Sequence, residues 1–361
     1  MHANGSPDRR PRLTPPIADI RRAVREVLTG LDGVGLDGEG PDGERPDGDS
    51  GDGAPGDPRG GLILVGLSGG ADSLALAAAT AFEAPRAGIR AGAVIIDHGL
   101  QADSATTAAR AAAQARALGL DPVVVARVEV DPSAGGPESA ARTARYAAFE
   151  RSLDDTGASH VLLAHTLDDQ AETVLLGLAR GSGPASLRGM SVETGPYLRP
   201  LLGIRRATTR QFCLDSGLDA WQDPHNDDPA FARVRVRNTV LPVLESELGP
   251  GIAEALARTA EQLREDADAL DGLALEWALE LTSQTEDGGV ALDVRGLAAD
   301  PPALRQRIIR LVVLSEFGVS LERVHTLAVA ELITDWHGQK ALTLPGVRVV
   351  RQNGLLVFTV A

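Results

Sequence analysis

A glycine-rich hexapeptide is the most chemically specific segment of this chain. It reads Ser68-Gly69-Gly70-Ala71-Asp72-Ser73 and follows Leu62–Leu67, an apolar run with the length of one buried strand. The alanine-rich residues Ser73–Ala84 are typical of a helix. A strand that turns through glycines into a helix N-terminus presents free backbone N–H groups and the positive end of the helix dipole to one point. The segment therefore predicts a phosphate site; its other interpretation is an ordinary Gly-Ser turn.

Asp72 adds a second requirement to this phosphate site. A carboxylate beside a polyphosphate is repelled unless a divalent cation lies between them, so Asp72 predicts a Mg²⁺ contact. The two serines of the hexapeptide supply hydroxyl donors. The hexapeptide contains no lysine and therefore differs from the G-x-x-x-x-G-K-[S/T] loop.

Strand and helix patterns alternate around the hexapeptide. This alternation predicts an α/β fold in which a parallel sheet carries helices on both faces. Ligands of such sheets bind at the carboxyl ends of the strands. The expected strands are Leu62–Leu67, Ala91–Ile96, Pro122–Val130 and His160–Ala164, and the expected helices are Ser73–Ala84, Ser104–Leu118, Ser139–Thr156 and Asp168–Arg180.

Three of the expected strands end in polar clusters. The first runs into the hexapeptide, the second into Asp97-His98-Gly99, and the fourth into His165 followed by Asp168-Asp169. Because parallel strands end at the same edge of a sheet, we expect the three clusters to share one crevice. Asp169 and Thr173 are four residues apart and share a helix face. Acids in the first turn also stabilise any helix, which is the alternative explanation for Asp168 and Asp169.

The chain of 361 residues is long enough for two domains. We expect a helical segment in 1–31, a disordered acidic insertion in 32–60, an α/β domain in 61–248, and a smaller, mostly helical domain with a short β segment in 249–361. Asn353-Gly354 is a hairpin signal. The later helices are expected at Gly203–Gly217, Phe231–Leu248, Gly251–Leu281, Leu292–Phe317 and Ser320–Asp335, and the strands within Ala341–Val360.

Composition excludes some classes of protein and leaves others open. No apolar run approaches the roughly 18–20 residues of a membrane span, so we expect a cytoplasmic protein without a membrane partner. A single cysteine, Cys213, excludes an internal disulfide framework. The formal net charge is −15, but nine acids against two arginines between Leu31 and Gly60 account for about half of it. Net charge therefore leaves a nucleic-acid partner open.

Arginines flank the expected crevice. Arg142 and Arg145 are three apart on one helix face and could hold a phosphate or form a solvated surface. A row of arginines beside a polar loop could follow a phosphate backbone or bridge to the acidic helix Glu254–Asp271. Trp221 precedes the polar loop; it stacks on a base or closes the core, and we favour the core. The further arginines are Arg180, Arg199, Arg233, Arg235 and Arg237.

Together these segments resemble the tRNA(Ile)-lysidine synthases, a family of PP-loop ATP pyrophosphatases. The resemblance runs from Leu62 to about Leu244. The hexapeptide alone indicates only the superfamily. The sequence Ala-His-x-x-Asp-Asp-Gln-x-Glu-Thr at 164–173, followed by Arg-Gly-Ser-Gly at 180–183, is much more specific. The chain departs from the family pattern at Thr166, where a second histidine is usual, and at Val234, where asparagine is usual.

The resemblance implies a two-step reaction. ATP first adenylates the carbon-2 oxygen of the wobble cytidine in an isoleucine tRNA with a CAU anticodon, and free L-lysine then displaces AMP. ATP and Mg²⁺ are the implied cofactors, with Ser68–Ser73 as the ATP-binding residues and Asp72 and Asp169 as metal ligands. The amine of lysine, with a pKa of about 10.4 in water, must lose a proton to attack. The implied catalytic residues are Asp72, Asp97, His98, His165 and Asp169, and the implied lysine or tRNA contacts are Arg142, Arg145, Glu172, Arg180, Arg199, Asn226, Arg233, Arg235 and Arg237.

Three other functions compete with this interpretation. A PP-loop enzyme that thiolates tRNA uses a persulfide or an iron–sulfur cluster, and a chain with only Cys213 lacks paired cysteines. A PP-loop amidating enzyme would lack the Asp-Asp-Gln-x-Glu-Thr and Arg-Gly-Ser-Gly segments. A nucleotide-binding module without catalysis would use the arginines only for packing or dimerisation. The sequence does not set the oligomeric state, and a homodimer stays open.

Overall fold

A computed structural model describes residues 13–32, 61–99, 104–128, 137–181, 183–223, 227–285 and 288–361. The chain forms two compact units, of which the first ends at Ala260 and the second runs from Glu261 to Ala361. All but the first residue of the expected insertion 32–60 lies outside the described residues, and so does Asn226. Among the described helices, none has the length and apolar character needed to cross a membrane.

A six-stranded sheet forms the centre of the first unit. Its order is β3-β2-β1-β4-β6-β5, and all neighbouring pairs are parallel except the antiparallel pair β6–β5. The prediction of a mostly parallel sheet is confirmed. The strands are β1 (Leu62–Gly66), β2 (Arg90–Asp97), β3 (Val123–Arg127), β4 (His160–Leu162), β5 (Glu193–Thr194) and β6 (Tyr197–Leu198).

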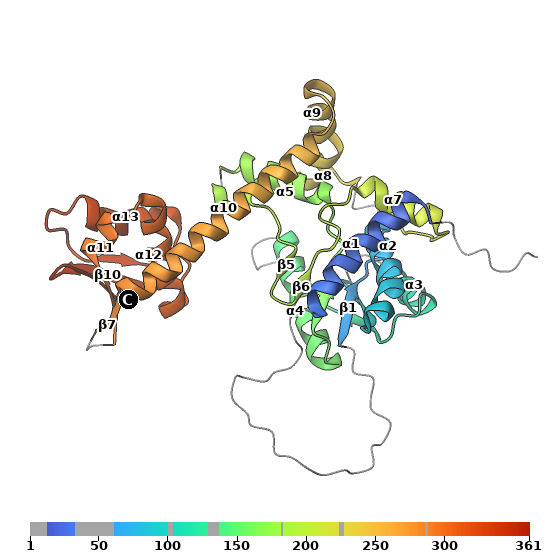
Figure 1. The fold of residues 1–361 in the computed structure, drawn as a ribbon, viewed down its shortest axis with the longest axis horizontal. Coiled ribbons are helices and arrows are strands. Elements are labelled where there is room, and N and C mark those ends of the chain that lie inside the picture. Colours follow the sequence, from blue (N-terminus) through green and yellow to red (C-terminus); the bar gives the residue numbers. More distant parts are fainter. Residues whose placement is uncertain are drawn as a thin grey trace, which may run out of the picture. The chain divides into compact units, whose positions relative to one another are not determined.

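Helices cover both faces of this sheet. Successive apolar side chains of β1 point to opposite faces, so each face needs a covering layer. Ile63 and Val65 belong to the larger core, which they share with α1, α2, α3 and α7. Leu62 and Leu64 belong to a second core with Phe149 of α4. Figure 1 shows α1, α2 and α3 grouped beside β1. These helices are α1 (Pro15–Asp32), α2 (Ala71–Glu83), α3 (Ser104–Ala117), α4 (Pro137–Thr156) and α7 (Arg206–Asp215).

A smaller core joins the remaining helices of the first unit. It contains Ala171 of α5, Val236 and Leu241 after α8, and Ala253 at the start of α10. The single helix expected over Phe231–Leu248 is instead two α-helices joined by one π-helical turn. The elements are η1 (Ala84–Ala87), α5 (Leu167–Ala179), α6 (Pro184–Leu187), α8 (Ala232–Arg235), the π turn η3 (Val236–Val240), α9 (Leu241–Leu248) and α10 (Ile252–Leu281).

The second unit has an antiparallel sheet of order β7-β8-β11-β10-β9. The helix expected from Leu292 is wrong at its start, because Val290–Asp293 pairs with β11 and buries Val290 and Leu292. The hairpin at Asn353-Gly354 is confirmed, with φ angles of 50° and 79° that suit a type I′ turn. The elements are β7 (Thr282–Gln284), β8 (Val290–Asp293), α11 (Val294–Ala299), α12 (Pro302–Phe317), α13 (Arg323–Thr334), β9 (Leu342–Leu344), β10 (Val347–Gln352) and β11 (Leu355–Val360).

Candidate active site

The carboxyl ends of β1, β2 and β4 open into one cavity of about 1030 Å³. The chain passes from β1 to β2 and β3 on one side of β1 and places β4 on the other. This reversal is the point where open α/β sheets bind ligands. The structure thus brings the three polar clusters together. The predicted site residues that line the cavity are Ser68, Gly70, Ala71, Asp72, Ser73, Asp97, His98, Arg145, His165, Asp169 and Arg237.

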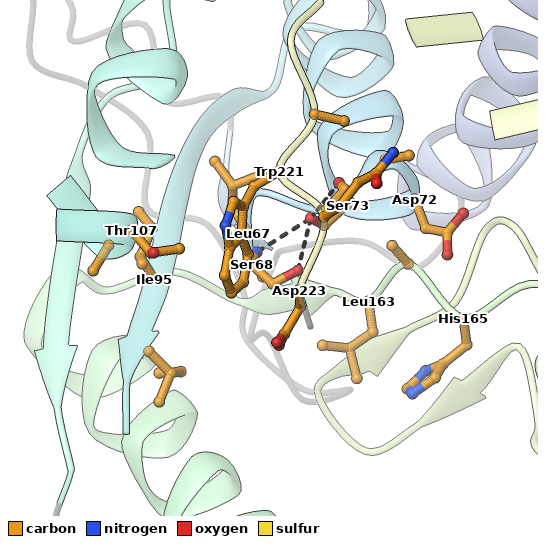
Figure 2. Close-up of a pocket in the computed structure, with 18 of the residues that line it drawn as sticks. Leu67, Ser68, Asp72, Ser73, Ile95, Thr107, Leu163, His165, Trp221 and Asp223 are labelled. Carbon is orange, nitrogen blue, oxygen red and sulfur yellow. Dashed lines mark hydrogen bonds between the residues drawn. The ribbon is translucent and has the colours of Figure 1, made fainter. Parts of the chain in front are cut away.

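The hexapeptide is folded as a preformed anion loop. The backbone N–H of Ser68 donates to Oγ of Ser73 at 3.2 Å, and that hydroxyl donates to the carbonyl of Gly70 at 3.0 Å (Figure 2). Gly69 has a φ of 84°, which glycine adopts without strain. No side chain caps the N-terminus of α2 at Gly70. The first N–H groups of α2 are therefore available to a phosphate.

Asp72 lies in this cavity with little compensation for its charge. It accepts a hydrogen bond from the hydroxyl of Thr209, and its Oδ2 lies 3.5 Å from Nε of Arg206. Burial raises the pKa of Asp72, although Thr209 and Arg206 oppose the shift. Within the described residues no three His, Cys, Asp or Glu side chains form a metal cluster. A Mg²⁺ held by one carboxylate and by phosphate oxygens fits this donor set.

Glu172 is the centre of a buried ion network. Its side chain is 0% exposed, and three guanidinium groups surround its carboxylate. The nitrogen–oxygen distances are 2.8 Å to Arg237 and 3.1 Å to each of Arg206 and Arg233. Because a buried charge is costly unless it is paired, the buried carboxylate of Glu172 is stabilised by these three arginines.

Asp169 connects this network to the start of α5. Its Oδ2 accepts hydrogen bonds of 2.8 Å from both the backbone N–H and the hydroxyl of Thr166, which caps α5. Its Oδ1 lies 2.8 Å from Arg206 and 3.4 Å from Arg237. Although burial alone would raise it, the pKa of Asp169 is lowered because Arg206 and Thr166 stabilise the carboxylate. With both oxygens engaged, Asp169 is a poorer metal ligand than Asp72.

Arg145 and two histidines, His98 and His165, also line the cavity. None of the ion pairs among the described residues includes Arg145, and burial lowers its pKa. Burial also lowers the pKa of His165 to about 4 and that of His98 below its ordinary value. Nδ1 of each ring is buried and has no hydrogen-bond partner within the described structure. Both imidazoles are therefore neutral at pH 7 beside a cation that can bind an anion.

Two family descriptions match the chain. A PP-loop domain covers residues 56–244, and a TilS substrate binding domain covers residues 292–357. A tRNA(Ile)-lysidine synthase of Leifsonia xyli subsp. xyli is 74% identical over 83% of this chain and 90% of its own length. The chain belongs to the tRNA(Ile)-lysidine synthase family.

Further relatives extend this result over nearly the whole chain. Synthases of Thermobifida fusca and Streptomyces coelicolor are 49% and 51% identical; each alignment covers 94% of this chain, and 96% and 97% of the relatives. The solved structure of the U34-tRNA thiolase NcsA from Methanococcus maripaludis, with its [4Fe-4S] cluster, has a TM-score of 0.52 and 17% identity. It covers 69% of this chain and 80% of the thiolase chain, and it shows a shared fold.

Several residues predicted from the family pattern lie outside the cavity lining. Glu172 is enclosed by three arginines and is absent from the cavity lining, and its contact with lysine or tRNA stays a prediction. Arg199 is buried and donates to the carbonyl of Ser191 and the hydroxyl of Thr194, which ties a loop to β6. Arg233 pairs with Glu172, and neither Arg233 nor Gly69 lines the cavity. Three further arginines are exposed, namely Arg142, Arg180 and Arg235.

The departures from the family pattern have local explanations. Thr166, where the family usually has histidine, is fully buried and caps α5 through its hydroxyl. Val234 is buried between Arg233 and Arg235. Sequence reasoning missed Arg206 and Thr209, which contact Asp72 from α7. The available signal was that both residues lie in the helix expected over Gly203–Gly217, directly after the Arg199–Leu202 segment.

The lowered pKa of His165 predicts an acid-dependent loss of stability. Unfolded histidine titrates near 6.5 and folded His165 near 4, so the unfolded chain binds one more proton between these values. The neutral, buried His165 therefore contributes to the free energy of unfolding. Its contribution is complete above pH 6.5 and falls by about 2 kcal/mol between pH 7 and pH 5. Urea denaturation of the wild type and His165→Asn at both pH values measures it. The variant should lose less stability on acidification; equal losses would contradict a buried neutral imidazole.

Proposed function

We propose that the chain ligates L-lysine to carbon 2 of the wobble cytidine in an isoleucine tRNA with a CAU anticodon, forming lysidine. The observation that carries this proposal is one cavity in which a phosphate loop, two neutral histidines and Arg145, which forms no ion pair with the described residues, meet. Its volume lies at the upper end of the roughly 300–1,000 Å³ of small-molecule sites, so there is room for a nucleotide and a second reactant. Membership of the synthase family supports the tRNA substrate.

In the first step the carbon-2 oxygen of the cytidine attacks the α-phosphorus of ATP. A bond forms between that oxygen and phosphorus, and the bond from phosphorus to the pyrophosphate oxygen breaks. The N–H groups at the start of α2 and the hydroxyl of Ser68 hold the departing pyrophosphate, while Ser73 fixes the shape of the loop. Arg145, which also lines the cavity, supplies positive charge. Bound Mg²⁺, held by Asp72, would neutralise charge on the phosphate oxygens.

In the second step the ε-amine of lysine attacks carbon 2, and AMP leaves with the oxygen. The ammonium group must first lose a proton. Asp97 and His98 are adjacent in the cavity, and the carboxylate opposes the burial that lowers the pKa of His98. His165 is the weaker base because it is more deeply buried and its pKa is about 4. We therefore assign proton acceptance to His98, with Asp97 stabilising the resulting imidazolium.

Sulfur transfer, the nearest alternative, has no support at this site. Cys213 lines the cavity, but burial raises its pKa to about 12, so the thiol stays protonated at pH 7. A protonated thiol is neither a good nucleophile nor a cluster ligand. The structural likeness to a tRNA thiolase is therefore a likeness of fold.

Incorporation of lysine tests the proposed function. The protein is incubated with ATP, Mg²⁺, radiolabelled lysine and unmodified isoleucine tRNA with a CAU anticodon. Label should enter this tRNA, while the same tRNA with uridine at the wobble position should stay unlabelled. If protein that binds ATP adds no lysine to the CAU tRNA, the proposal is wrong.

A further inference from the structure

The cavity has an apolar part that the proposed chemistry does not use. It is formed by Leu67 after β1, by Val94–Ile96 of β2, and by Thr107 and Ala108 of α3. Figure 2 shows Leu67 and Trp221 between Ile95 and Thr107 on one side and Asp72 and His165 on the other. In this view the apolar part lies beside Ser68 of the phosphate loop and away from Asp72 and His165, while the carboxylate of Asp223 lies near Ser68 and Trp221. A nucleotide with its phosphates on that loop needs such a place for its base.

Trp221 belongs to this part of the cavity and not to the hydrophobic core. It is half-buried and lines the cavity, and it is absent from the described core clusters. Its neighbours Leu218 and Ala220 do pack against the larger core. The expectation that Trp221 closes the core is therefore wrong. An indole with an accessible face in a cavity is a stacking surface.

Backbone contacts fix Trp221 against the phosphate loop. Its N–H donates to the carbonyl of Gly69 at 2.9 Å, and a Cβ on Gly69 would lie 3.9 Å from the Cβ of Trp221. The preceding Asp219 is bound to α3, since its carboxylate lies 2.6 Å from Arg110 and its carbonyl accepts from Gln114 at 2.7 Å. The backbone that carries the indole is thus held in place before a ligand arrives, which reduces the entropy lost on binding.

We propose that Trp221 stacks on the adenine ring of the ATP whose phosphates occupy Ser68–Ser73. This inference rests on the ATP use in the proposed function. Adenine is favoured over the tRNA cytidine because the backbone of Trp221 is hydrogen-bonded to Gly69, within the loop that holds the phosphates of ATP in the proposed function. Stacking of a base on an aromatic side chain contributes about 1–3 kcal/mol, which corresponds to about 5- to 150-fold in affinity. Stacking does not depend on tRNA or lysine.

Tryptophan fluorescence tests this contact directly. The chain has three tryptophans, and Trp277 and Trp336 belong to the second unit, so the double variant Trp277→Phe/Trp336→Phe retains Trp221 alone. ATP and AMP, each added without tRNA, should quench its emission, whereas inorganic triphosphate should not. Equal quenching by inorganic triphosphate, quenching only after tRNA is added, or unchanged emission while radiolabelled ATP binds would overturn the inference.

Kinetics of Trp221 variants in the otherwise native chain provide a second test. We expect Trp221→Leu to raise the KM for ATP by about 5- to 150-fold and leave kcat at saturating ATP within about threefold. Trp221→Phe, which keeps an aromatic face, should stay within about threefold of the wild-type KM. An unchanged KM in Trp221→Leu would contradict stacking. If ATP quenches the emission of Trp221 but the protein never forms lysidine, the proposed function is wrong and the stacking stands. If the protein forms lysidine but ATP leaves the emission of Trp221 unchanged, the stacking is wrong and the proposed function stands.

Discussion

Asp72→Asn is expected to lower tRNA adenylation by about 100-fold or more, while the affinity for tRNA stays unchanged. The substitution keeps the shape of the side chain but removes the negative charge that would hold Mg²⁺ against the phosphates. It also removes a buried carboxylate whose pKa is raised in the folded protein. A raised carboxyl pKa means that the fold disfavours the ionised form, so the variant should be at least as stable as the wild type at pH 7.

Three measurements separate this result from a general loss of structure. Pyrophosphate release reports adenylation, filter binding reports tRNA affinity, and urea denaturation reports stability. Asp19→Asn is a matched control, because Asp19 is exposed on α1 and the same charge is removed. The control should keep wild-type adenylation. An equal loss of adenylation and tRNA affinity in Asp72→Asn would contradict the assigned role.

Arg206→Ala is expected to lower the free energy of unfolding by about 2–3 kcal/mol. Within the part of the chain that the structure describes, Arg206 is the one side chain that pairs with Asp72, Asp169 and Glu172 together, and it is only 12% exposed. Removal leaves buried carboxylates with less positive charge around them. Glu172 retains Arg233 and Arg237, which is why the expected loss is below the full cost of an unpaired charge. Urea denaturation at pH 7 measures the loss.

The neighbouring arginine provides the control for this variant. Arg205 pairs with Asp168 and Glu254 but is 37% exposed, so Arg205→Ala should cost less than about 1 kcal/mol. Arg206→Lys keeps the charge but cannot reach three carboxylates, and it should lie between the wild type and Arg206→Ala. Equal stability of the two alanine variants would contradict the network centred on Glu172.

The phosphate loop and the strand ends could be predicted because their signals are local. Ser68–Ser73 carries its own turn chemistry, and parallel strands must end at the same edge of the sheet. The misassigned strand Val290–Asp293 lacks such a signal. It is short, and it becomes a strand by pairing with β11, more than sixty residues later in the chain. Pattern alone does not separate a short apolar run from the start of a helix.

The ion network could be predicted only in part. Arg233 and Arg237 are four residues apart and reach Glu172 together, whereas Arg235 points away and is exposed. Residues four apart in a helix share a face, whereas a residue two positions away lies on another face, so helical spacing predicts that Arg235 differs from Arg233 and Arg237. The contacts of α7 with the loop have no counterpart in local pattern, since Thr209 and Asp72 are 137 residues apart. The interpretation that these arginines follow a phosphate backbone therefore missed that two of them neutralise the buried carboxylate of Glu172.

Transfer of AMP to the tRNA is the most direct test of this account. The protein is incubated with ATP labelled in its α-phosphate, Mg²⁺ and CAU-anticodon isoleucine tRNA, without lysine. We predict that the label becomes bound to the tRNA and is released as AMP when lysine is added. Label that appears on lysine instead, or a tRNA that stays unlabelled while ATP is bound, would contradict adenylation of the base at the Ser68–Ser73 loop.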